Sequence, residues 1–287
     1  MKLALGCVQF GLDYGITNQQ GQVANEQVRA ILARAAYHGI KTLDTAALYG
    51  DSETVLGQYA PLLPSAEVIT KLGDITSPEQ VRQGLETSLT KLNRKAIHGL
   101  LLHRPDILLT PQGAAIASQL NALKEEQKIS LWGVSVYHPE QLIQLCNRVN
   151  FDLVQLPLNI FDQRFLQQDL LKRLNQQGIS IHARSLLLQG LLCQGQWPAA
   201  FNRWQPQLQH LKNLAKEHNI NLLPLALSFC HQVKYVERFV LGCQSVSQLD
   251  EIVTAYKTTQ GLEIDFSKLA CNDLDFILPS NWPPQSN

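Results

Sequence analysis

The sequence predicts an α/β fold, a single (β/α)8 TIM barrel, and three observations support this prediction. Eight short apolar runs are spaced along the chain, with stretches of helical periodicity between them. Several of the runs end on a single polar residue, as parallel strands do when a ligand site lies at their C-terminal ends. The chain has 287 residues, and such a barrel typically needs about 250. We therefore expect one domain over residues 1–287.

The apolar runs are the predicted strands, and no domain linker, internal repeat or low-complexity tract interrupts their order. They lie near residues 3–7, 40–44, 67–71, 98–103, 131–135, 152–156, 179–183 and 238–241. Continuous apolar runs of this kind are typical of strands that are buried on both faces, as in a parallel barrel.

Amphipathic stretches between these runs are the predicted helices. They span residues 25–38, 77–92, 111–128, 139–148 and 163–177. Ser77, Thr110 and His138 each precede a proline, which is common at the first position of a helix. Gly39 and Gly178 follow helical runs, where a left-handed residue often ends a helix.

The longest connection runs from Ser185 to Arg238, between the seventh and eighth predicted strands. We expect it to combine an extended loop over the barrel with an extra helix from about 204 to 218. The tail, from about 278 to 287, contains prolines that exclude a regular helix. We expect this tail either to lie across the barrel mouth or to be a flexible end.

Composition excludes several classes of function. Lys and Arg number 24, as do Asp and Glu, and no basic run alternates with aromatic residues. We therefore expect no nucleic-acid partner. No apolar stretch approaches the roughly 18 residues that span a bilayer, and the N-terminus lacks a signal-peptide pattern. We expect a cytoplasmic protein with no membrane contact, and nothing indicates an obligate protein partner.

The cysteines indicate neither a disulfide framework nor a metal site. They are scattered, with no Cys-x-x-Cys pair and no histidine at zinc spacing. We expect no metal, and reduced, mostly buried thiols. The six residues are Cys7, Cys146, Cys193, Cys230, Cys243 and Cys271.

Four predicted strands end on an acid, an amine, an imidazole and an amide. These residues are Asp44, Lys71, His103 and Gln155. The C-terminal ends of barrel strands lie together, so we expect one shared site. Taken one at a time, the charged residues have ordinary structural explanations, such as a turn cap or a satisfied core histidine. Together they indicate a catalytic site.

Tyr49 adds a proton donor to this set. It follows Asp44 by five residues, where the chain leaves the strand, so both side chains can face one cavity. A tyrosine hydroxyl is a poor acid near neutral pH unless a nearby ammonium stabilises the phenolate. Lys71 can supply that ammonium, and Asp44 can keep it charged. His103 can then hydrogen-bond the carbonyl oxygen that receives the proton.

With these residues in place, the chain resembles the aldo-keto reductases. The matching segments are Leu5-Gly6-Cys7-Val8-Gln9-Phe10-Gly11, Asp44-Thr45-Ala46, Tyr49-Gly50, Ser52-Glu53, Thr70-Lys71, Leu101-Leu102-His103, Gly133-Val134-Ser135, Val154-Gln155, Gln189-Gly190, Gly242, Gln248-Leu249 and Glu251. The resemblance implies a catalytic tetrad of Asp44, Tyr49, Lys71 and His103. It also implies a nicotinamide cofactor bound across the barrel top without a Gly-x-Gly-x-x-Gly fingerprint, which this sequence lacks.

The resemblance further implies which residues contact the cofactor. They are Ser135, Gln155, Arg184, Ser185, Gln189, Gly190, Gly242, Gln248 and Glu251. Ser135 and Gln155 match positions that bond the nicotinamide carboxamide, although both could instead satisfy backbone groups.

Three positions depart from the family's pattern. Val136 stands where an asparagine often makes a further carboxamide contact, and Arg184 stands where an aromatic residue commonly stacks on the nicotinamide ring. A guanidinium can also stack, but it adds a positive charge. Gln248 stands where an arginine often binds the adenosine 2′-phosphate. The resemblance implies NADP(H), and Gln248 leaves NAD(H) as the alternative.

We expect an NAD(P)(H)-dependent oxidoreductase that interconverts a carbonyl, in an aldehyde, ketone or sugar, and an alcohol by hydride transfer. Tyr49 would act as the general acid and base. Two alternatives stay open. One is a regulatory barrel that binds the cofactor with little turnover. The other is a metal-dependent hydrolase or isomerase, which would need more ligands at strand ends than Asp44 and His103.

Overall fold

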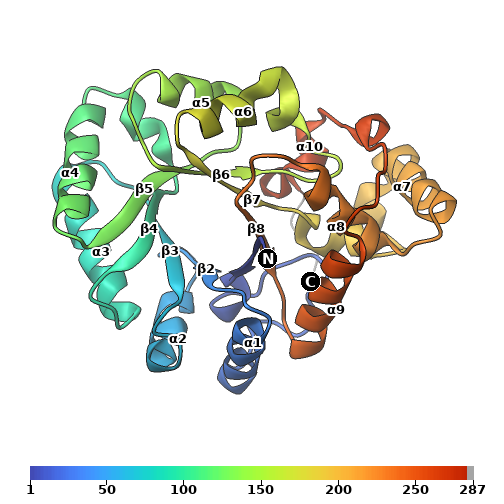
Figure 1. Cartoon of the computed structure of the whole chain (residues 1–287), viewed down its shortest axis with the longest axis horizontal. Helices are drawn as coiled ribbons and strands as arrows, with labels where there is room; N and C mark the ends of the chain where they lie inside the picture. The colour runs from blue at the N-terminus through green and yellow to red at the C-terminus, as the bar shows by residue number, and fades with distance from the viewer. Residues whose placement is uncertain (283–287) are drawn as a thin grey trace.

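Eight parallel strands close into a barrel with helices around it (Figure 1). In the computed structural model, which describes residues 1–282, the strands follow chain order around the barrel and β8 pairs with β1. They are β1 (Leu3–Gly6), β2 (Thr42–Asp44), β3 (Glu67–Leu72), β4 (Ile97–Leu102), β5 (Ile129–Ser135), β6 (Leu153–Pro157), β7 (Ser180–Arg184) and β8 (Arg238–Gly242). The predicted (β/α)8 fold is confirmed, and every predicted strand is present.

The helices form an outer layer over the strands, and α7 lies farthest from the barrel (Figure 1). They are α1 (Asn25–Tyr37), α2 (Ser52–Gln58), α3 (Pro78–Lys91), α4 (Gly113–Glu125), α5 (Pro139–Cys146), α6 (Leu170–Gln176), α7 (Gln205–Glu217), α8 (Leu222–Gln232), α9 (Val246–Thr258) and α10 (Leu274–Ile277).

Local signals at the helix ends work largely as predicted. The Ser77 hydroxyl accepts a hydrogen bond from the Gln80 amide at 3.4 Å and caps α3. Gly39 and Gly178 both have φ +77°, the left-handed conformation expected after a helix. The helix predicted from residue 111 begins only at Gly113, because the chain first completes a turn that bonds the Gly113 amide to the Thr110 carbonyl.

One predicted helix, 163–177, is wrong as a single element. A 3-10 segment (Arg164–Asp169) comes first, and α6 begins at Leu170. Gln167 is extended, with ψ 152°, and Gln168 is left-handed, with φ 53°, so helical bonding stops there. Apolar residues continue at helical spacing on both sides of the break, which hides it from the sequence pattern.

The connection between β7 and β8 contains the expected extra helix as α7, followed by a second helix, α8, that was not predicted. All six consecutive residues from Leu225 to Cys230 in α8 are buried. A helix that is buried around most of its circumference shows no amphipathic period, so the sequence pattern does not mark it.

The described part of the tail packs against the rest of the chain. Leu278 is buried, and Pro279–Asn281 forms a 3-10 turn, so a regular helix is absent there as expected. The Trp282 ring lies 4.9 Å from the Phe201 ring, and its indole N–H bonds to the Phe276 carbonyl at 2.9 Å. Residues 283–287 of the predicted flexible end lie outside the described residues.

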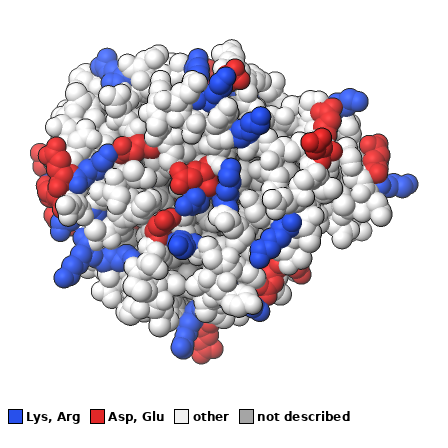
Figure 2. Space-filling view, viewed as in Figure 1, with Lys and Arg blue, Asp and Glu red and all other residues white. Residues whose placement is uncertain are grey.

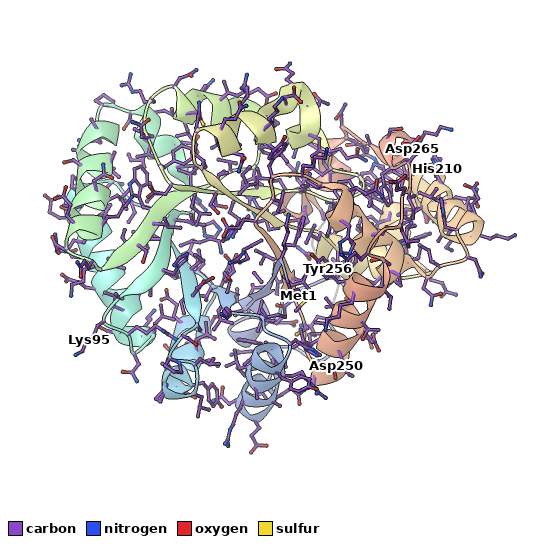
Figure 3. All side chains as sticks on the ribbon, viewed as in Figure 1. Met1, Lys95, His210, Asp250, Tyr256 and Asp265 are labelled. Atoms are coloured by element: carbon purple, nitrogen blue, oxygen red, sulfur yellow. The ribbon has the colours of Figure 1, made fainter. Side chains whose placement is uncertain are left out.

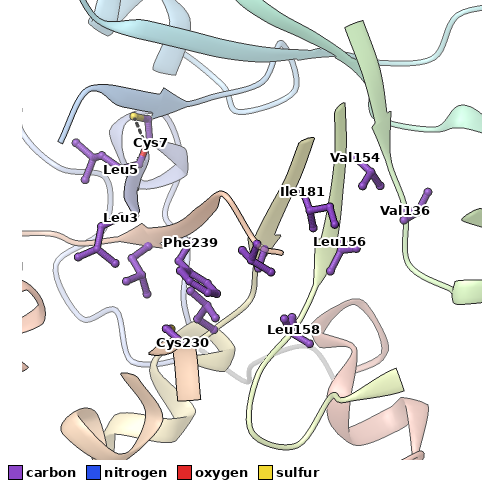
Figure 4. Close-up of a cluster of buried hydrophobic side chains, with 14 of the residues drawn as sticks. Leu3, Leu5, Cys7, Val136, Val154, Leu156, Leu158, Ile181, Cys230 and Phe239 are labelled. Atoms are coloured by element: carbon purple, nitrogen blue, oxygen red, sulfur yellow. Dashed lines mark hydrogen bonds between the residues drawn. The ribbon is translucent and has the colours of Figure 1, made fainter. Parts of the chain in front are cut away.

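Two apolar clusters position the strand ends. The large one fills the space between the strands and the helices, and Figure 4 shows the part of it around Phe239 and Ile181. The small one, made of Ile69, Leu101 and Leu153, is separate. Side chains alternate along a strand, so the residues two positions further along share the direction of this small cluster. Those residues are Lys71, His103 and Gln155.

Burying a leucine or isoleucine contributes about 1.5–3 kcal/mol, so the small cluster resists displacement and gives the polar layer above it a firm base. At the outer layer, Asp250 on α9 bonds His38 at 2.6 Å and Arg34 at 3.2 Å. Figure 3 labels Asp250 on α9, beside α1. This contact holds the start of α9 in place next to the strand ends.

The surface carries both signs of charge. Figure 2 shows Lys and Arg side chains interspersed with Asp and Glu on the visible face, without a continuous field of either sign. Among residues 1–282, no helix combines the length and apolar character that crossing a bilayer requires.

Candidate active site

A cleft of about 400 Å³ lies at the C-terminal ends of the strands. Of the predicted site residues, Asp44, Tyr49, His103, Gln155, Arg184, Ser185, Gln189, Gly190, Gly242, Gln248 and Glu251 line it. Lys71 and Ser135 do not line it, because both are buried beneath its surface, with 0% and 1% of their area exposed. The fold thus brings residues from across the whole sequence into one place.

Asp44 is the centre of a buried network at the cleft floor. Lys71 Nζ donates to Asp44 Oδ2 at 2.7 Å and to the Thr45 carbonyl at 2.9 Å. Gln155 Nε2 donates to Asp44 Oδ1 at 2.7 Å, from the opposite side of the barrel. Burial alone would lower the pKa of Lys71, but the charges of Asp44 and Tyr49 and the hydrogen bond to Asp44 together outweigh it, so the pKa lies above its usual value. Lys71 is therefore a fixed cation.

Tyr49 lies directly above this cation. Lys71 Nζ is 4.9 Å from the centre of the Tyr49 ring. The His103 ring meets the Tyr49 ring edge to face, with 6.0 Å between their centres. Burial, followed by the charges of Lys71 and Arg184, lowers the pKa of His103 to about 4. The imidazole is thus neutral near pH 7 and can donate from only one nitrogen.

Several buried polar atoms at this end of the barrel have no hydrogen-bond partner. They include Gln155 Oε1, Ser135 Oγ and His103 Nδ1. Ser135 and Gln155 occupy paired positions on β5 and β6. Buried polar atoms nearly always have partners, so unpaired ones grouped together fit a missing ligand group. A hydroxyl beside an amide oxygen fits a carboxamide, which is the group that the nicotinamide ring carries.

Arg184 lines the cleft but bonds mainly to its surroundings. Its guanidinium carbon lies 4.2 Å from the centre of the Tyr137 ring. Nη2 donates to the Val136 carbonyl at 3.1 Å and Nη1 to the Ser185 hydroxyl at 3.3 Å. Within residues 1–282, no carboxylate forms an ion pair with it. Arg184 is therefore held rigidly, with its charge uncompensated.

The loop after β7 adopts an unusual backbone where it borders the cleft. Ser185, Leu188 and Gln189 have φ values of 62°, 43° and 54°, and Gly190 has φ 92°. A Cβ on Gly190 would lie 2.3 Å from the Thr17 hydroxyl, so only glycine allows this loop to meet the one after β1. Left-handed non-glycine residues are costly and cluster at functional sites.

The loop after β1 is the main part of the site that sequence analysis missed. Tyr14, Gly15, Thr17 and Asn18 all line the cleft. Tyr14 is 37% exposed as a whole, but its hydroxyl reaches inward, where burial raises the pKa to about 12. Three glycines within eleven residues, at positions 11, 15 and 21, are the only local signal that could have marked this segment.

Gln9 is a second missed residue. A Cβ on Gly242 would lie 2.5 Å from Gln9 Oε1, so the amide of Gln9 lies directly against the Gly242 backbone. This close approach explains why position 242 carries glycine. Gln9 Oε1 is itself buried and unpaired, and Gln9 lines the cleft.

The start of α9 forms the far end of the cleft. The Ser245 hydroxyl accepts from the Gln248 amide at 3.1 Å, and Gln248 Oε1 accepts from the Gln244 amide at 2.8 Å. This pair resembles a capping box, except that the second bond comes from Gln244, the residue before the N-cap, and it occupies the Gln248 oxygen. Glu251, one turn further along, is exposed and lines the cleft.

The thiols only partly follow the expectation that most are buried. Cys7, Cys230 and Cys243 are buried, Cys146 and Cys271 are half-buried, and Cys193 is exposed. Within the described residues, no three His, Cys, Asp or Glu side chains are grouped as metal ligands would be.

Comparison with known proteins gives a second line of evidence beside the geometry of the cleft. The model of the Aldo/keto reductase family matches residues 2–268. L-galactose dehydrogenase of Arabidopsis thaliana is 28% identical over 290 residues, which cover 92% of this chain and 89% of the relative. 6-dehydroglucose reductase of Agrobacterium fabrum is 25% identical over 90% of this chain and 91% of its own length. NADH-specific methylglyoxal reductase of Escherichia coli is 29% identical over 54% of each chain.

Solved structures show the same fold. The aldo-keto reductase AKR11C1 from Bacillus halodurans, in its holo form, superposes with a TM-score of 0.76 at 20% identity, over 94% of this chain and 92% of its own. The glycerol dehydrogenase AKR11B4 from Gluconobacter oxydans superposes with a TM-score of 0.72 at 22% identity, over 100% and 95% of the two chains. Because the family model spans nearly the whole sequence, this chain belongs to the aldo/keto reductase family of oxidoreductases, whose general activity is nicotinamide-dependent carbonyl reduction.

Proposed function

We propose that this protein interconverts a carbonyl and an alcohol with NAD(H) or NADP(H), and that Tyr49 transfers the proton. The observation that carries the proposal is the buried Lys71 cation, bonded to Asp44 and lying 4.9 Å from the Tyr49 ring. A cation in this position stabilises the phenolate that forms when Tyr49 gives up its proton.

Each of the polar side chains at the cleft floor has its own role in this proposal. Tyr49 donates a proton to the carbonyl oxygen in reduction and accepts it back in oxidation. Asp44 holds Lys71 charged and in place, since both are nearly fully buried. The neutral imidazole of His103 donates a hydrogen bond to the same carbonyl oxygen and orients it. The nicotinamide ring, when bound, supplies or receives the hydride.

The cofactor would lie along the cleft. Ser135 and Gln155 offer their unpaired atoms to the carboxamide, and Arg184 borders the ring. The rest of the cofactor would contact Ser185, Gln189, Gly190, Gly242, Gln248 and Glu251. We propose that residues 1–287 work as a single domain. Cytoplasmic location and the absence of an obligate protein partner stay predictions from the sequence.

A sugar is the favoured substrate among the aldehydes, ketones and sugars that fit this chemistry. The names of two relatives aligned over most of their length, L-galactose dehydrogenase and 6-dehydroglucose reductase, refer to sugars. Tyr14, Tyr137 and His103 border the space beside Tyr49, and such side chains combine an apolar face with a polar group.

The experiment is the Tyr49→Phe variant, which removes the proton donor and keeps the ring. Carbonyl reduction should fall by about 10²–10⁴-fold, the usual contribution of a general acid. Cofactor affinity should hardly change, as measured by fluorescence titration. Tyr14→Phe loses a hydroxyl from the same cleft and should lose far less activity.

A Tyr49→Phe enzyme that keeps most of its rate would contradict the role given to Tyr49. The regulatory alternative makes a different prediction for the wild type. It would bind a nicotinamide cofactor yet oxidise it only slowly over a panel of aldehydes, ketones and sugars.

A further inference from the structure

We propose that Ser52 and Glu53, the first two residues of α2, are positioning residues that fix the distance between Lys71 and Tyr49. Neither of the two lines the cleft. This inference rests on the proposed function, because it assumes that the Lys71 cation stabilises the phenolate of Tyr49. It concerns side chains behind the cleft wall, so the two proposals can be tested separately.

Glu53 is a buried acid that proton transfer does not use. It is 1% exposed, and its Oε1 accepts a hydrogen bond from the Thr70 hydroxyl at 2.6 Å, whereas its Oε2 has no partner. Across residues 1–282, Glu53 takes part in no ion pair. Burying an acid without a cation is costly. Its presence here therefore indicates that the contact with Thr70 matters for more than stability.

Thr70 connects this acid to the catalytic cation. It precedes Lys71 on β3, and neighbouring side chains of a strand point to opposite faces. The Thr70 hydroxyl therefore faces the helix layer, while Lys71 faces the barrel interior. The Lys71 carbonyl also accepts from the Ala47 amide at 2.9 Å, two residues before Tyr49. Glu53 thus holds β3 from outside at the point where Lys71 reaches inward.

Ser52 connects the same helix end to two other strands. It is fully buried, and its hydroxyl donates to the Cys7 carbonyl, just after β1, at 2.8 Å. The same hydroxyl lies 2.9 Å from the Thr45 hydroxyl, just after β2. The Ser52 amide donates to the Tyr49 carbonyl at 3.0 Å. Together with Glu53, Ser52 therefore bonds the start of α2 to the ends of β1, β2 and β3.

These bonds determine how far the cation lies from the phenol. Tyr49 is on the turn between β2 and α2, so its position depends on α2, whereas the position of Lys71 depends on β3. The Glu53–Thr70 bond joins the two elements directly. Lys71 Nζ lies 4.9 Å from the centre of the Tyr49 ring. At an effective dielectric constant of about 20, each additional ångström would weaken the stabilisation of the phenolate by the equivalent of about half a pH unit.

The test is Thr70→Val, which removes the hydroxyl and keeps a branched side chain. For the panel compound that the wild type reduces fastest, kcat should fall by about 10–10²-fold, the cost of misplacing a reacting group by about 1 Å. The alkaline limb of the pH–rate profile should move to higher pH, because a less stabilised phenolate holds its proton more tightly. Thr70→Ser keeps the hydroxyl and should restore most of the rate and the profile.

Two further measurements separate positioning from a general loss of structure. Ser52→Ala removes the bonds to Cys7 and Thr45 and should lower kcat and move the alkaline limb in the same direction. In a Tyr49→Phe background, neither Thr70→Val nor Ser52→Ala should lower the residual rate further, because no phenol is left to position. Cofactor dissociation constants should stay at the wild-type values, as measured by fluorescence titration.

The matched control is Thr42→Val. Thr42 on β2 is 2% exposed and donates to Glu67 at 2.7 Å, so it makes the same kind of bond at the N-terminal end of the barrel. Its loss should lower the free energy of unfolding but leave kcat and the pH–rate profile at their wild-type values. The fraction folded, obtained from urea unfolding curves, corrects the rates of all variants.

Three results would overturn the inference. Thr70→Val could keep the wild-type kcat and pH–rate profile. Thr42→Val could lower kcat as much as Thr70→Val does. The losses could be as large in the Tyr49→Phe background as in the wild type. If Thr70→Val does not fold, Ser52→Ala decides by the same criteria.

Failure of this inference differs from failure of the proposed function. A Tyr49→Phe enzyme that keeps its rate would overturn both. Wild-type behaviour of Thr70→Val and Ser52→Ala beside an inactive Tyr49→Phe would overturn the positioning alone.

Discussion

The two ends of the barrel each hold a cation, a carboxylate and a neutral hydrogen-bonding residue. At the N-terminal end, Arg238 Nε donates to the Thr42 hydroxyl at 2.9 Å, and Nη2 lies 3.4 Å from Glu67 Oε2. The Thr42 hydroxyl also donates to Glu67 at 2.7 Å. At the C-terminal end, Lys71 and Gln155 both donate to Asp44 at 2.7 Å.

The two networks differ in how far water reaches their charges and in whether they contain unpaired polar atoms. At the N-terminal end, water reaches the charges, with 25% of the Arg238 side chain and 33% of the Glu67 side chain exposed. At the C-terminal end, Lys71 is fully buried, while Gln155 Oε1 and the neighbouring Ser135 Oγ have no partner. A closed network serves the fold alone, and a buried network with unpaired atoms is prepared for a ligand.

The largest expected contrast comes from removing the cation at each end. Lys71→Met leaves Asp44 buried without its counter-charge and should lower the free energy of unfolding by about 3–5 kcal/mol. Arg238→Met breaks a partly exposed pair and should cost about 1 kcal/mol or less. Carbonyl reduction should collapse in the first variant and persist in the second. Urea unfolding and kcat/KM measure the two effects.

Equal losses of activity in the two variants would remove the distinction between the ends. Equal losses in the free energy of unfolding would mean that breaking the buried Lys71–Asp44 pair costs no more than breaking the partly exposed Arg238–Glu67 pair. The fraction folded at the assay temperature, obtained from the same unfolding curves, corrects the activities.

A smaller contrast concerns histidines inside the barrel. His182 on β7 is 4% exposed, its Nδ1 has no partner, and burial lowers its pKa to about 4. An unfolded histidine has a pKa of about 6.5. Below that value the unfolded state binds the proton and the folded state does not, so stability falls as the pH drops from about 6.5 to about 4.

His182→Asn should therefore reduce the acid sensitivity. The free energy of unfolding should drop by up to about 3 kcal/mol less between pH 7 and pH 4 than in the wild type. His218→Asn, at an exposed position after α7, is the control and should leave the pH dependence unchanged. An acid sensitivity that survives in His182→Asn would assign the effect to other groups, such as His103 at the C-terminal end.

The smallest expected effect concerns Arg184. If it borders the nicotinamide ring, its uncompensated charge should favour the neutral reduced ring over the cationic oxidised one. Arg184→Tyr keeps a stacking surface and should tighten the oxidised cofactor several-fold more than the reduced one, as measured by titration. Equal changes in both dissociation constants would place the guanidinium away from the ring, against Tyr137 alone.

The sequence by itself predicted the barrel because each strand and most helices carry their own local signal. A parallel strand is apolar throughout, and an amphipathic helix repeats its apolar residues with a regular period. The polar residue that ends a strand, as at Asp44 or His103, marks the proposed catalytic face for the same local reason. Where the local signal is missing, prediction failed, as for the evenly buried α8 and the break at Gln168.

Only the tertiary structure decided what each side chain bonds to. Gln155 was predicted from its strand end, but its bond to Asp44 spans 111 positions in the sequence. Gly190 against Thr17 and Arg184 against Tyr137 likewise join segments that are far apart in the sequence. Such pairs depend on how the barrel closes and on distances across it, which no single segment encodes. Apolar periodicity specifies which way a residue faces, and the closed fold specifies what it meets there.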